Sequence, residues 1–584
     1  MTETTPVSTT VIEIRNLSFQ YPLGTVPSIK HINLQIQAGE YVVIAGPTGS
    51  GKTTLALCLN GIIPHLVEGE MEGEVVVDGM ETSTHPVHEL TSSIGLVFQN
   101  PEDQLFSLNV TDEVAFGVEN MGYTHPEIVE RVDKAIQRIG LQSRKDYSIF
   151  HLSGGQKQKV AIATNLAISP KIFVLDSPTA DLDPVSSMEV VNTLIDLRKQ
   201  EPSKTFIVID SDISDVINLA DRIIVMNEGQ ILLDSTPTDL IKNHFDELVK
   251  IGIRIPDHVR MMHWLVTQLP DLQDFSLEEG EVQGILDKLI LSGNLRFREP
   301  VEVKSEPDRP SIVKFDHVSF TYPKGPVILE DSSLDIKNGE WLAIIGENGT
   351  GKSTLLKLIC GLIKPQSGVV TTAGINTASK NLDDVLNNIG YLFQNPDNQL
   401  FMPTVEDEIG FGPGRKNCSP EEIAARVDEA LDLMALQNYR KKHPFTLSRG
   451  MRQRLAVATV LAARPKLLLL DEPTTGQDQI ALDNLMGLTQ NLIDHHGASV
   501  VMVTHDMDLV AQHATRVIVL DKGKILLDGT PQDIFAREQD VLAKVSLKPP
   551  CMAKLTTGLS SSCACLTTFQ YFLSSASIQQ VVLP

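Results

Sequence analysis

The sequence predicts an α/β protein with two tandem domains, each built around a mainly parallel sheet. A glycine-rich loop, Gly46-Pro-Thr-Gly-Ser-Gly-Lys-Thr-Thr54, returns 300 residues later as Gly346-Glu-Asn-Gly-Thr-Gly-Lys-Ser-Thr354. Around each loop, apolar strand-like runs alternate with helix-like segments, which is typical of a parallel sheet covered on both faces. Because the surroundings repeat together with the loop, we expect the same architecture in both domains.

The first domain, assigned to residues 1–240, contains runs that predict its strands in order. Two alternating runs come first, then an apolar run that ends at the glycine loop, followed by the helix Thr53–Asn60. Two further apolar runs each end in an acid, and a hairpin closes the domain. The predicted strands and hairpin are Val11–Phe19, His31–Ile36, Tyr41–Ala45, Ile172–Asp176, Phe206–Asp210 and Arg222–Leu233.

The second domain, assigned to residues 311–545, repeats this order with matched spacing. The separations Gln99 to Ser153 and Gln394 to Ser448 are both 54 residues, and Ser153 to Asp176 and Ser448 to Asp471 are both 23. Chance does not produce such agreement, so the two domains should be copies of one unit.

Three other segments complete the predicted organisation. Residues 241–298 form a helical extension, in which Val259–Val266 has helical periodicity, and the charged, proline-bearing residues 299–310 form a linker. Residues 546–584 form a tail of low charge, and Cys551–Pro584 contains one charged side chain, Lys554. We expect a poorly ordered or aberrant terminus there, with a partner-binding segment as the alternative, and assign it no function.

Composition excludes several classes of function. The net charge of −25 argues against a general nucleic-acid binder, and the six cysteines have no spacing suited to zinc or an iron–sulfur cluster. No run approaches the roughly 20 apolar residues that span a bilayer, so work at a membrane would need a partner that supplies the membrane part. Residues 1–6 have no signal-peptide pattern, so we expect the cytoplasm as the compartment.

The two glycine loops predict nucleotide phosphate binding. Glycines let backbone N–H groups approach phosphates, and the following helix presents its positive end. Lys52 and Lys352 would reach the β- and γ-phosphates, while Thr53 and Ser353 would ligate Mg²⁺. A glycine-rich turn without nucleotide is the alternative for a single loop, and one loop alone leaves the class of nucleoside triphosphatase (NTPase) open.

The segment Leu152-Ser-Gly-Gly-Gln156, followed by Asp176, narrows the class. With the loops, it resembles the ATP-binding-cassette (ABC) ATPases, over about residues 11–240 and 311–542. The resemblance implies P-loop NTPase domains of ABC type, each with a mainly parallel sheet core, an antiparallel β subdomain and a helical subdomain. It also implies that two such domains pair head to tail within one chain and that each ATP lies between the loop of one and the LSGGQ segment of the other.

In the second domain, the resemblance assigns a complete set of roles. Asp471 and Gln394 would bind Mg²⁺, Glu472 would be the general base, and His505 would contact the γ-phosphate. Tyr322 would stack on adenine, although a partly buried strand residue is the alternative. The residues assigned to ATP contact there are Tyr322, Gly346, Glu347, Asn348, Gly349, Thr350, Gly351, Lys352, Ser353, Thr354 and Asp471.

In the first domain, the same resemblance assigns ATP and Mg²⁺ binding, with Thr53, Gln99 and Asp176 as metal ligands. The residues assigned to ATP contact are Tyr21, Gly46, Gly49, Gly51, Lys52, Thr53, Thr54, Gln99 and Asp176, with Ser153, Gly154, Gly155 and Gln156 clamping the other nucleotide. Ser177 stands where the glutamate belongs, and Ser211 stands where the histidine belongs if Asp212 is paired with Asp506.

The second domain departs from the family at the clamp, where Leu447-Ser-Arg-Gly-Met451 carries Arg449 for a glycine and Met451 for the glutamine. Under head-to-tail pairing, these departures fall in one composite site together with Ser177 and Ser211. We therefore expect one hydrolytic site and one site that holds ATP, because a serine cannot accept a proton from water as a carboxylate can.

A segment that contains Gln99 in the first domain and Gln394 in the second suggests the class of transporter. Phe98-Gln-Asn-Pro-Glu-Asp-Gln-Leu-Phe106 and Phe393-Gln-Asn-Pro-Asp-Asn-Gln-Leu-Phe401 resemble the ATPase of energy-coupling-factor (ECF) importers of vitamins, cobalt or nickel. Ile255-Pro-Asp-His-Val-Arg260 is similar to the same group. The resemblance implies a groove for a transmembrane coupling subunit, a separate substrate-binding membrane subunit, and a peripheral position on the cytoplasmic face of the cell membrane. The alternative is that Leu105, Phe106, Leu400 and Phe401 fill the core of the helical subdomain.

Two other functions stay open at this point. A two-domain ATPase acting on ribosomes or DNA would need a long basic linker, a coiled-coil insertion or a cysteine-rich domain, and the sequence contains none of these. A fused sugar-importer ATPase also has two unequal domains, but the doubled QNPxxQLF segment argues against it.

Overall fold

The computed structural model describes residues 10–22, 24, 26–180, 182–270, 272, 274–297, 309–323, 325–379, 382–416, 418–447, 449–474, 477–555, 568 and 576–578. The chain divides into two compact units, one of Met1–Val259 with Ser276–Glu278 and one of Arg260–Phe275 with Glu279–Pro584. Among the described residues, each unit contains one glycine loop, one six-stranded sheet that is mainly parallel and one four-stranded antiparallel sheet, and the second unit also contains a two-stranded sheet.

The first unit has a six-stranded sheet in the order β10-β9-β3-β8-β7-β6, parallel throughout except for the antiparallel hairpin β9–β10. Its strands are β3 (Tyr41–Ala45), β6 (Ile94–Val97), β7 (Ile172–Asp176), β8 (Thr205–Asp210), β9 (Arg222–Asn227) and β10 (Gln230–Ser235). An antiparallel sheet in the order β2-β1-β4-β5 contains β1 (Thr10–Gln20), β2 (Ile29–Gln37), β4 (Glu70–Val77) and β5 (Met80–Glu81).

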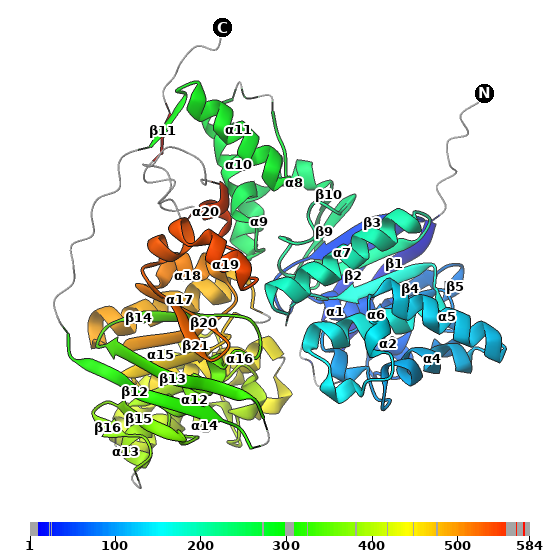
Figure 1. The fold of residues 1–584 in the computed structure, drawn as a ribbon. Coiled ribbons are helices and arrows are strands. Elements are labelled where there is room, and N and C mark those ends of the chain that lie inside the picture. Colours follow the sequence, from blue (N-terminus) through cyan, green and yellow to red (C-terminus); the bar gives the residue numbers. More distant parts are fainter. Residues whose placement is uncertain are drawn as a thin grey trace. The chain divides into compact units, whose positions relative to one another are not determined.

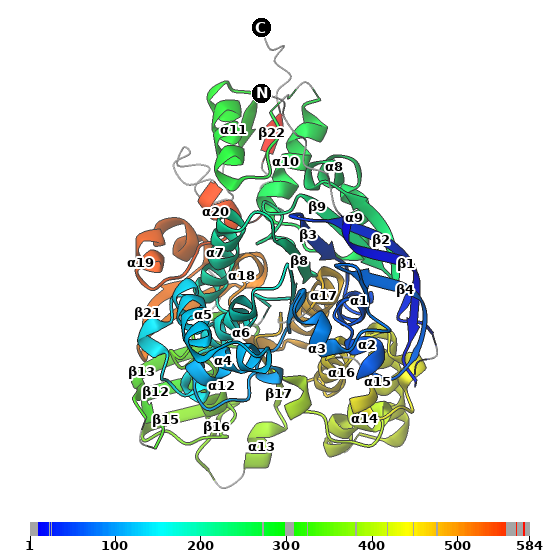
Figure 2. The ribbon, with the colours of Figure 1, turned by 90° about the vertical axis from the view of Figure 1, so that its right-hand side faces the viewer.

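Helices of the first unit follow the strands and connect them. Three of them, α4, α5 and α6, pack together as a small helical subdomain (Figure 2). The helices are α1 (Lys52–Leu59), α2 (Ile62–His65), α3 (Val87–Leu90), α4 (Val110–Asn120), α5 (His125–Arg138), α6 (Gly154–Ile168), α7 (Pro184–Gln200), α8 (Pro237–Asn243) and α9 (Phe245–Ile251).

The second unit repeats both sheets (Figure 1). Its six-stranded sheet, β17-β18-β19-β14-β20-β21, comprises β14 (Trp341–Ile345), β17 (Ile389–Leu392), β18 (Leu467–Asp471), β19 (Ser499–Val503), β20 (Arg516–Asp521) and β21 (Lys524–Gly529). Its antiparallel sheet, β13-β12-β15-β16, comprises β12 (Ser311–Thr321), β13 (Val327–Lys337), β15 (Ser367–Thr372) and β16 (Ile375–Asn376). The predicted fold class, two α/β domains with mainly parallel sheets, is confirmed.

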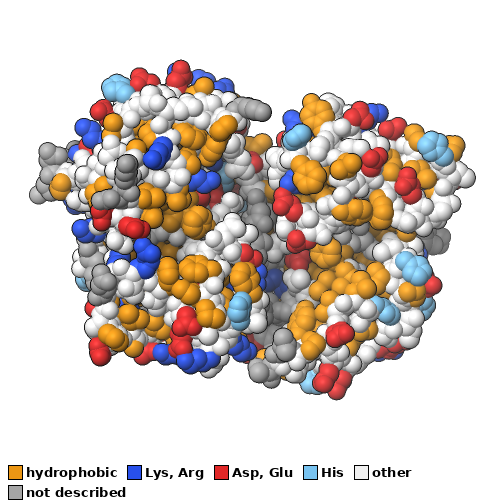
Figure 3. Space-filling model, turned by 90° about the horizontal axis from the view of Figure 1, so that it is seen from below, with side chains coloured by type: hydrophobic (Ala, Val, Ile, Leu, Met, Phe, Trp, Pro, Cys, Tyr) orange, Lys and Arg blue, Asp and Glu red, His pale blue; other side chains and the backbone are white. Residues whose placement is uncertain are grey.

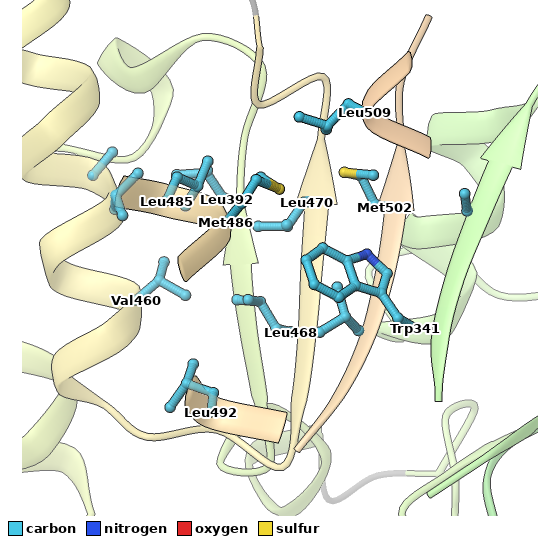
Figure 4. Close-up of a cluster of buried hydrophobic side chains, with 14 of the residues drawn as sticks. Trp341, Leu392, Val460, Leu468, Leu470, Leu485, Met486, Leu492, Met502 and Leu509 are labelled. Carbon is cyan, nitrogen blue, oxygen red and sulfur yellow. The ribbon is translucent and has the colours of Figure 1, made fainter. Parts of the chain in front are cut away.

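One core of the second unit lies between its parallel sheet and flanking helices. Trp341 on β14 is buried among Leu468 and Leu470 of β18, Met502 of β19, and side chains of the helices (Figure 4). The helices of this domain are α12 (Lys352–Ile359), α13 (Leu382–Leu386), α14 (Val405–Arg415), α15 (Pro420–Leu433), α16 (Arg449–Ala462), α17 (Gln479–His496), α18 (Met507–His513) and α19 (Gln539–Lys544).

The helical extension has a small core of its own. Helices α10 (Asp257–Gln268) and α11 (Glu279–Leu291) contribute Met262, Leu265 and Leu286, and the short α20 (Cys551–Leu555) adds Met552 and Leu555. Strand β11 (Leu295–Phe297) pairs antiparallel with β22 (Ala576–Ile578). Residues 299–308 of the linker and most of the tail lie outside the described residues, whereas α20 at the start of the tail packs on the extension.

The predicted strands agree closely with the structure. Tyr41–Ala45 and Ile172–Asp176 are strands with those bounds, and Phe206–Asp210 begins one residue earlier, at Thr205. The helix predicted over Thr53–Asn60 runs from Lys52 to Leu59. Among the described residues, no helix is both long and apolar enough to cross a membrane.

Candidate functional site

Each glycine loop joins a buried parallel strand to a helix that begins at its lysine. A Cβ at Gly46 would lie 2.3 Å from the carbonyl oxygen of Met226, and one at Gly346 would lie 2.4 Å from that of Leu520. Only glycine fits where the loop backbone approaches a neighbouring strand this closely. The loop path is therefore fixed by packing, and it leaves α1 and α12 with their positive ends at the loop.

The loop lysines are buried and held by loop carbonyls. Lys52 Nζ donates to the carbonyl oxygens of Gly46 at 2.6 Å and Pro47 at 2.9 Å, and Lys352 Nζ donates to those of Gly346 at 2.7 Å and Glu347 at 2.8 Å. The ammonium groups thus lie inside the loops, where the backbone N–H groups of a phosphate site converge.

A hydroxyl and a carboxylate meet beside each lysine. Thr53 Oγ1 donates to Asp176 Oδ2 at 2.7 Å, and Ser353 Oγ donates to Asp471 Oδ1 at 3.0 Å. Burial raises the pKa of both aspartates. Hard oxygen donors of this kind suit Mg²⁺. Gln99 and Gln394 follow β6 and β17, and no hydrogen bond among the described residues joins their side chains to these pairs.

The second domain has an additional group at this position. Tyr391 on β17 donates its hydroxyl to Asp471 Oδ2 at 2.9 Å. Strand register pairs Tyr391 with Leu469 and Leu96 with Val174, so Leu96 is the counterpart of Tyr391 in the first domain. Sequence reasoning missed this contact, because the two residues are 80 positions apart.

Glu472 and His505 contact each other in the second domain. Glu472 follows β18 with a φ of 50°, and its N–H donates to the carbonyl oxygen of Val503 at 2.9 Å. Glu472 Oε2 accepts from the N–H of His505 at 3.2 Å, and Oε1 lies 3.1 Å from His505 Nε2. His505 Nε2 also lies 2.9 Å from Asn348 Oδ1 in the glycine loop. Burial raises the pKa of Glu472, although the positive charge of Lys352 acts to lower it.

The first domain keeps this backbone and changes its side chains. Ser177 has a φ of 45°, and its N–H donates to the carbonyl oxygen of Ile209 at 2.7 Å. Register pairs Ile44 with Ile209 and Ile344 with Val503, so Ser211 corresponds to His505 and Asp210 to Thr504. Asp210 Oδ1 accepts from the N–H groups of Ser211 at 2.7 Å and Asp212 at 3.1 Å. Burial raises the pKa of Asp210 to about 7.

The LSGGQ segment caps a helix in the first domain. Ser153 and Gln156 form a capping box at the start of α6, and Arg144 Nη1 donates to Gln156 Oε1 at 2.8 Å. A Cβ at Gly155 would lie 2.5 Å from Ser186 Cβ, whereas one at Gly154 would meet only Leu182, at 3.7 Å. Packing within the domain therefore requires the second glycine and leaves room at the first.

In the second domain the corresponding segment is described only in part. Ser448 and the side chain of Arg449 lie outside the described residues. Met451, at the position of Gln156, packs against the core of this domain. A thioether cannot make the charge-assisted hydrogen bond that Gln156 accepts from Arg144.

Comparison with known proteins identifies the family. The family model described as ABC transporter matches residues 29–180 and 329–475, which include both glycine loops and both aspartates. The chain belongs to this family. An ABC transporter ATP-binding protein of Methanosarcina mazei is 39% identical over 94% of this chain and 94% of its own length, and one of Caldanaerobacter subterraneus subsp. tengcongensis is 40% identical over 94% and 96%.

One solved structure is similar over a single domain. It is cbiO1 from Clostridium perfringens, described as part of the ABC transporter complex cbiONQ. The match has 33% identity, covers 45% of this chain and 97% of that one, and has a TM-score of 0.37. As an ABC transporter ATP-binding protein, this chain carries ATPase domains of a family that binds ATP.

Within each ABC domain, a tyrosine lies beside the glycine-loop helix. The hydroxyl of Tyr21 lies 3.2 Å from Thr54 Oγ1, and that of Tyr322 lies 3.3 Å from Thr354 Oγ1. Each ring also packs edge-on against a phenylalanine two residues earlier, Phe19 or Phe320. Tyr322 is 36% exposed, so its ring both packs on the domain and reaches solvent.

The QNPxxQLF segments of both ABC domains present phenylalanines to solvent. Phe106 is 63% exposed and meets Phe116 edge-on at 4.7 Å, while Phe401 is 61% exposed and meets Phe411 at 5.0 Å. Leu400 is buried in the core, whereas Leu105 is half-buried. The interpretation that these residues fill the core is therefore right for Leu400 and wrong for the two phenylalanines. Figure 3 shows hydrophobic side chains gathered in patches on the face that it presents.

A buried glutamate holds each of these loops, which explains the acidic start of the following helix. Glu113 Oε2 accepts from the N–H groups of Phe106 at 3.0 Å and Ser107 at 2.6 Å. Glu408 Oε2 accepts from those of Phe401 at 2.8 Å and Met402 at 2.6 Å. Sequence reasoning missed this role of the two glutamates.

Proposed function

We propose that this chain is the ATP-hydrolysing subunit of an ECF-type importer, which energises uptake of a vitamin or metal ion through separate membrane subunits. The observation that carries the proposal is a pair of exposed phenylalanines in each domain, one on the QNPxxQLF loop and one on the helix that follows it: Phe106 with Phe116 of α4, and Phe401 with Phe411 of α14. Exposed aromatic clusters of this kind mark binding sites for partners. A helix of a transmembrane coupling subunit is the proposed partner, and a second membrane subunit binds the solute.

The proposal includes a location and a route from that surface to the nucleotide. The chain works at the cytoplasmic face of the cell membrane, where its two domains pair head to tail. Each docking loop, Phe98–Phe106 or Phe393–Phe401, is also joined to the helix that begins in the clamp segment. Lys157 of α6 pairs with Glu102, and Arg452 Nε of α16 donates to Asp397 Oδ1 at 2.6 Å. A helix pressed on the loop would therefore shift the start of α6 or α16.

The chemistry is divided between the domains in this proposal. Mg-ATP at the second domain is held by Lys352, Ser353, Gln394 and Asp471, and Glu472 takes a proton from the attacking water while His505 contacts the γ-phosphate. Hydroxyl and carboxylate oxygens fit Mg²⁺, which would neutralise phosphate charge when bound. The first domain binds Mg-ATP through Tyr21, Lys52, Thr53, Gln99 and Asp176 and has Ser177 and Ser211 in place of the base and the histidine.

Co-purification from detergent-solubilised membranes tests this function. We expect the chain to come out with a small helical membrane protein identified by mass spectrometry, and Phe106→Ser with Phe401→Ser to abolish that association while ATP binding persists. Val249→Ser is a matched control, because this exposed apolar side chain lies on α9, away from both loops in sequence. Recovery with ribosomes, or membrane association that survives both substitutions, contradicts the proposal.

A further inference from the structure

A carboxylate in the first domain lies one strand away from the position of the missing glutamate. Strand register aligns Asp210, the last residue of β8, with Thr504, which directly follows β19. Thr504 has no charge, so the first domain loses one acid at Ser177 and gains another one strand away. The lost acid and the gained acid belong to the ends of two neighbouring strands, because β7 and β8 pair in parallel with Asp176 opposite Ile209.

Asp210 takes over two contacts that the second domain divides between two residues. There, the N–H of His505 donates to Glu472 Oε2 and the N–H of Asp506 donates to Thr504 Oγ1 at 3.1 Å. In the first domain, the matching N–H groups of Ser211 and Asp212 both donate to Asp210 Oδ1. The carboxylates of Asp210 and Glu472 therefore bind the same backbone N–H of the repeat.

The surroundings of the two carboxylates also match. Asp210 and Glu472 are both buried, and in each case the loop lysine of the same domain, Lys52 or Lys352, lies close enough to favour the charged form. Among the described residues, Asp210 Oδ2 makes no hydrogen bond, so one oxygen is available for a water. A turn cap alone does not need a carboxylate, since Thr504 makes the equivalent contact with a hydroxyl.

We propose that Asp210 is a general base for ATP held by the first domain. As the water oxygen bonds to the γ-phosphorus, a water proton passes to Asp210 Oδ2. The bond from that phosphorus to the β–γ bridging oxygen breaks, which leaves ADP and phosphate. The first domain lacks the histidine that stands beside Glu472, so hydrolysis there is slower than at the second domain. This inference rests on the proposed roles of the two nucleotide sites.

Single-turnover hydrolysis in a Glu472→Gln background tests it, with the full chain in excess over Mg-ATP. We expect slow residual hydrolysis that Asp210→Asn lowers at least about tenfold, since loss of a general base costs about 10²–10⁴-fold in rate. An asparagine Oδ1 still accepts from both N–H groups, so nucleotide affinity, measured with a fluorescent ATP analogue, is retained. Asp210→Thr copies the second domain and is expected to give the same loss.

Two control variants test whether the residual hydrolysis takes place at the nucleotide site of the first domain. Lys52→Ala in the same background should remove it, and Ser177→Glu should raise it by restoring a glutamate at its usual position. Equal hydrolysis with and without Asp210→Asn, or no hydrolysis once Glu472 is replaced, overturns the role of Asp210. A Glu472→Gln chain with the parent's turnover contradicts instead the division of labour between the domains, whatever Asp210 does.

Discussion

The two nucleotide sites have nearly the same backbone and different chemistry. The lysine, hydroxyl and aspartate contacts of the first domain recur in the second within 0.3 Å, from 2.6 to 2.9 Å against 2.7 to 3.0 Å. Ser177 and Glu472 even share a left-handed backbone, with φ values of 45° and 50°. Phosphate binding depends on the path of the backbone, which the core fixes, whereas proton transfer depends on a few side chains that can change without moving it.

The largest effect is expected from removing the proposed general base, an acid that the second domain has and the first domain replaces by Ser177. Glu472→Gln should lower steady-state ATP turnover by about 10²–10⁴-fold, because the amide cannot accept a proton from water. Its matched control is Ser177→Ala in the first domain, which should change turnover little. Comparable losses from both, measured as phosphate release, would show that the two sites share the chemistry equally.

The next test concerns the glycines of the LSGGQ segment. Gly155→Ala should lower the free energy of unfolding by about 1–3 kcal/mol, a typical cost of overpacking, because its Cβ would meet Ser186 at 2.5 Å. Gly154→Ala is the control, since that Cβ would come no closer than 3.7 Å to any neighbour. Denaturant unfolding measures both. Equal stability of the two variants would mean that packing within the domain requires neither glycine. Contact with a nucleotide would then be the remaining reason for glycine at both positions.

The sequence predicts the parts of each site that depend on local pattern. The loops, Asp176, Asp471 and Glu472 follow from apolar runs that end at fixed positions, and the structure places all of them at strand ends. Asp210 was visible as an acid closing an apolar run, but its two N–H contacts depend on the turn beyond the strand. Tyr391 and Glu113 were missed because their roles arise from packing between elements, which alternation and spacing do not encode.

A smaller effect is expected from the tyrosine that only the second site has. Tyr391→Phe removes the hydroxyl that donates to Asp471 and should raise the Mg²⁺ concentration needed for half-maximal turnover about tenfold, as loss of a partner to a metal ligand commonly does. The control is Leu96→Ile in the first domain, where the apolar side chain has no such bond to lose. An unchanged Mg²⁺ requirement in Tyr391→Phe would show that Ser353 alone orients Asp471.

The smallest expected effect is a difference in stability between variants that remove the ion pair of one docking loop or the other. Arg452 binds Asp397 with two guanidinium nitrogens, at 2.6 and 3.3 Å, and donates to the carbonyl oxygen of Leu447 at 2.8 Å, whereas Lys157 meets Glu102 through one ammonium. Arg452→Ala should therefore lower stability by about 1 kcal/mol and Lys157→Ala by less, as expected for partly exposed ion pairs. Hydrogen exchange at the loop N–H groups should rise more in the second domain than in the first. No rise in either domain would mean that the loops are held by Glu113 and Glu408 alone, so that pressure from a docked helix would reach α4 and α14 before α6 and α16.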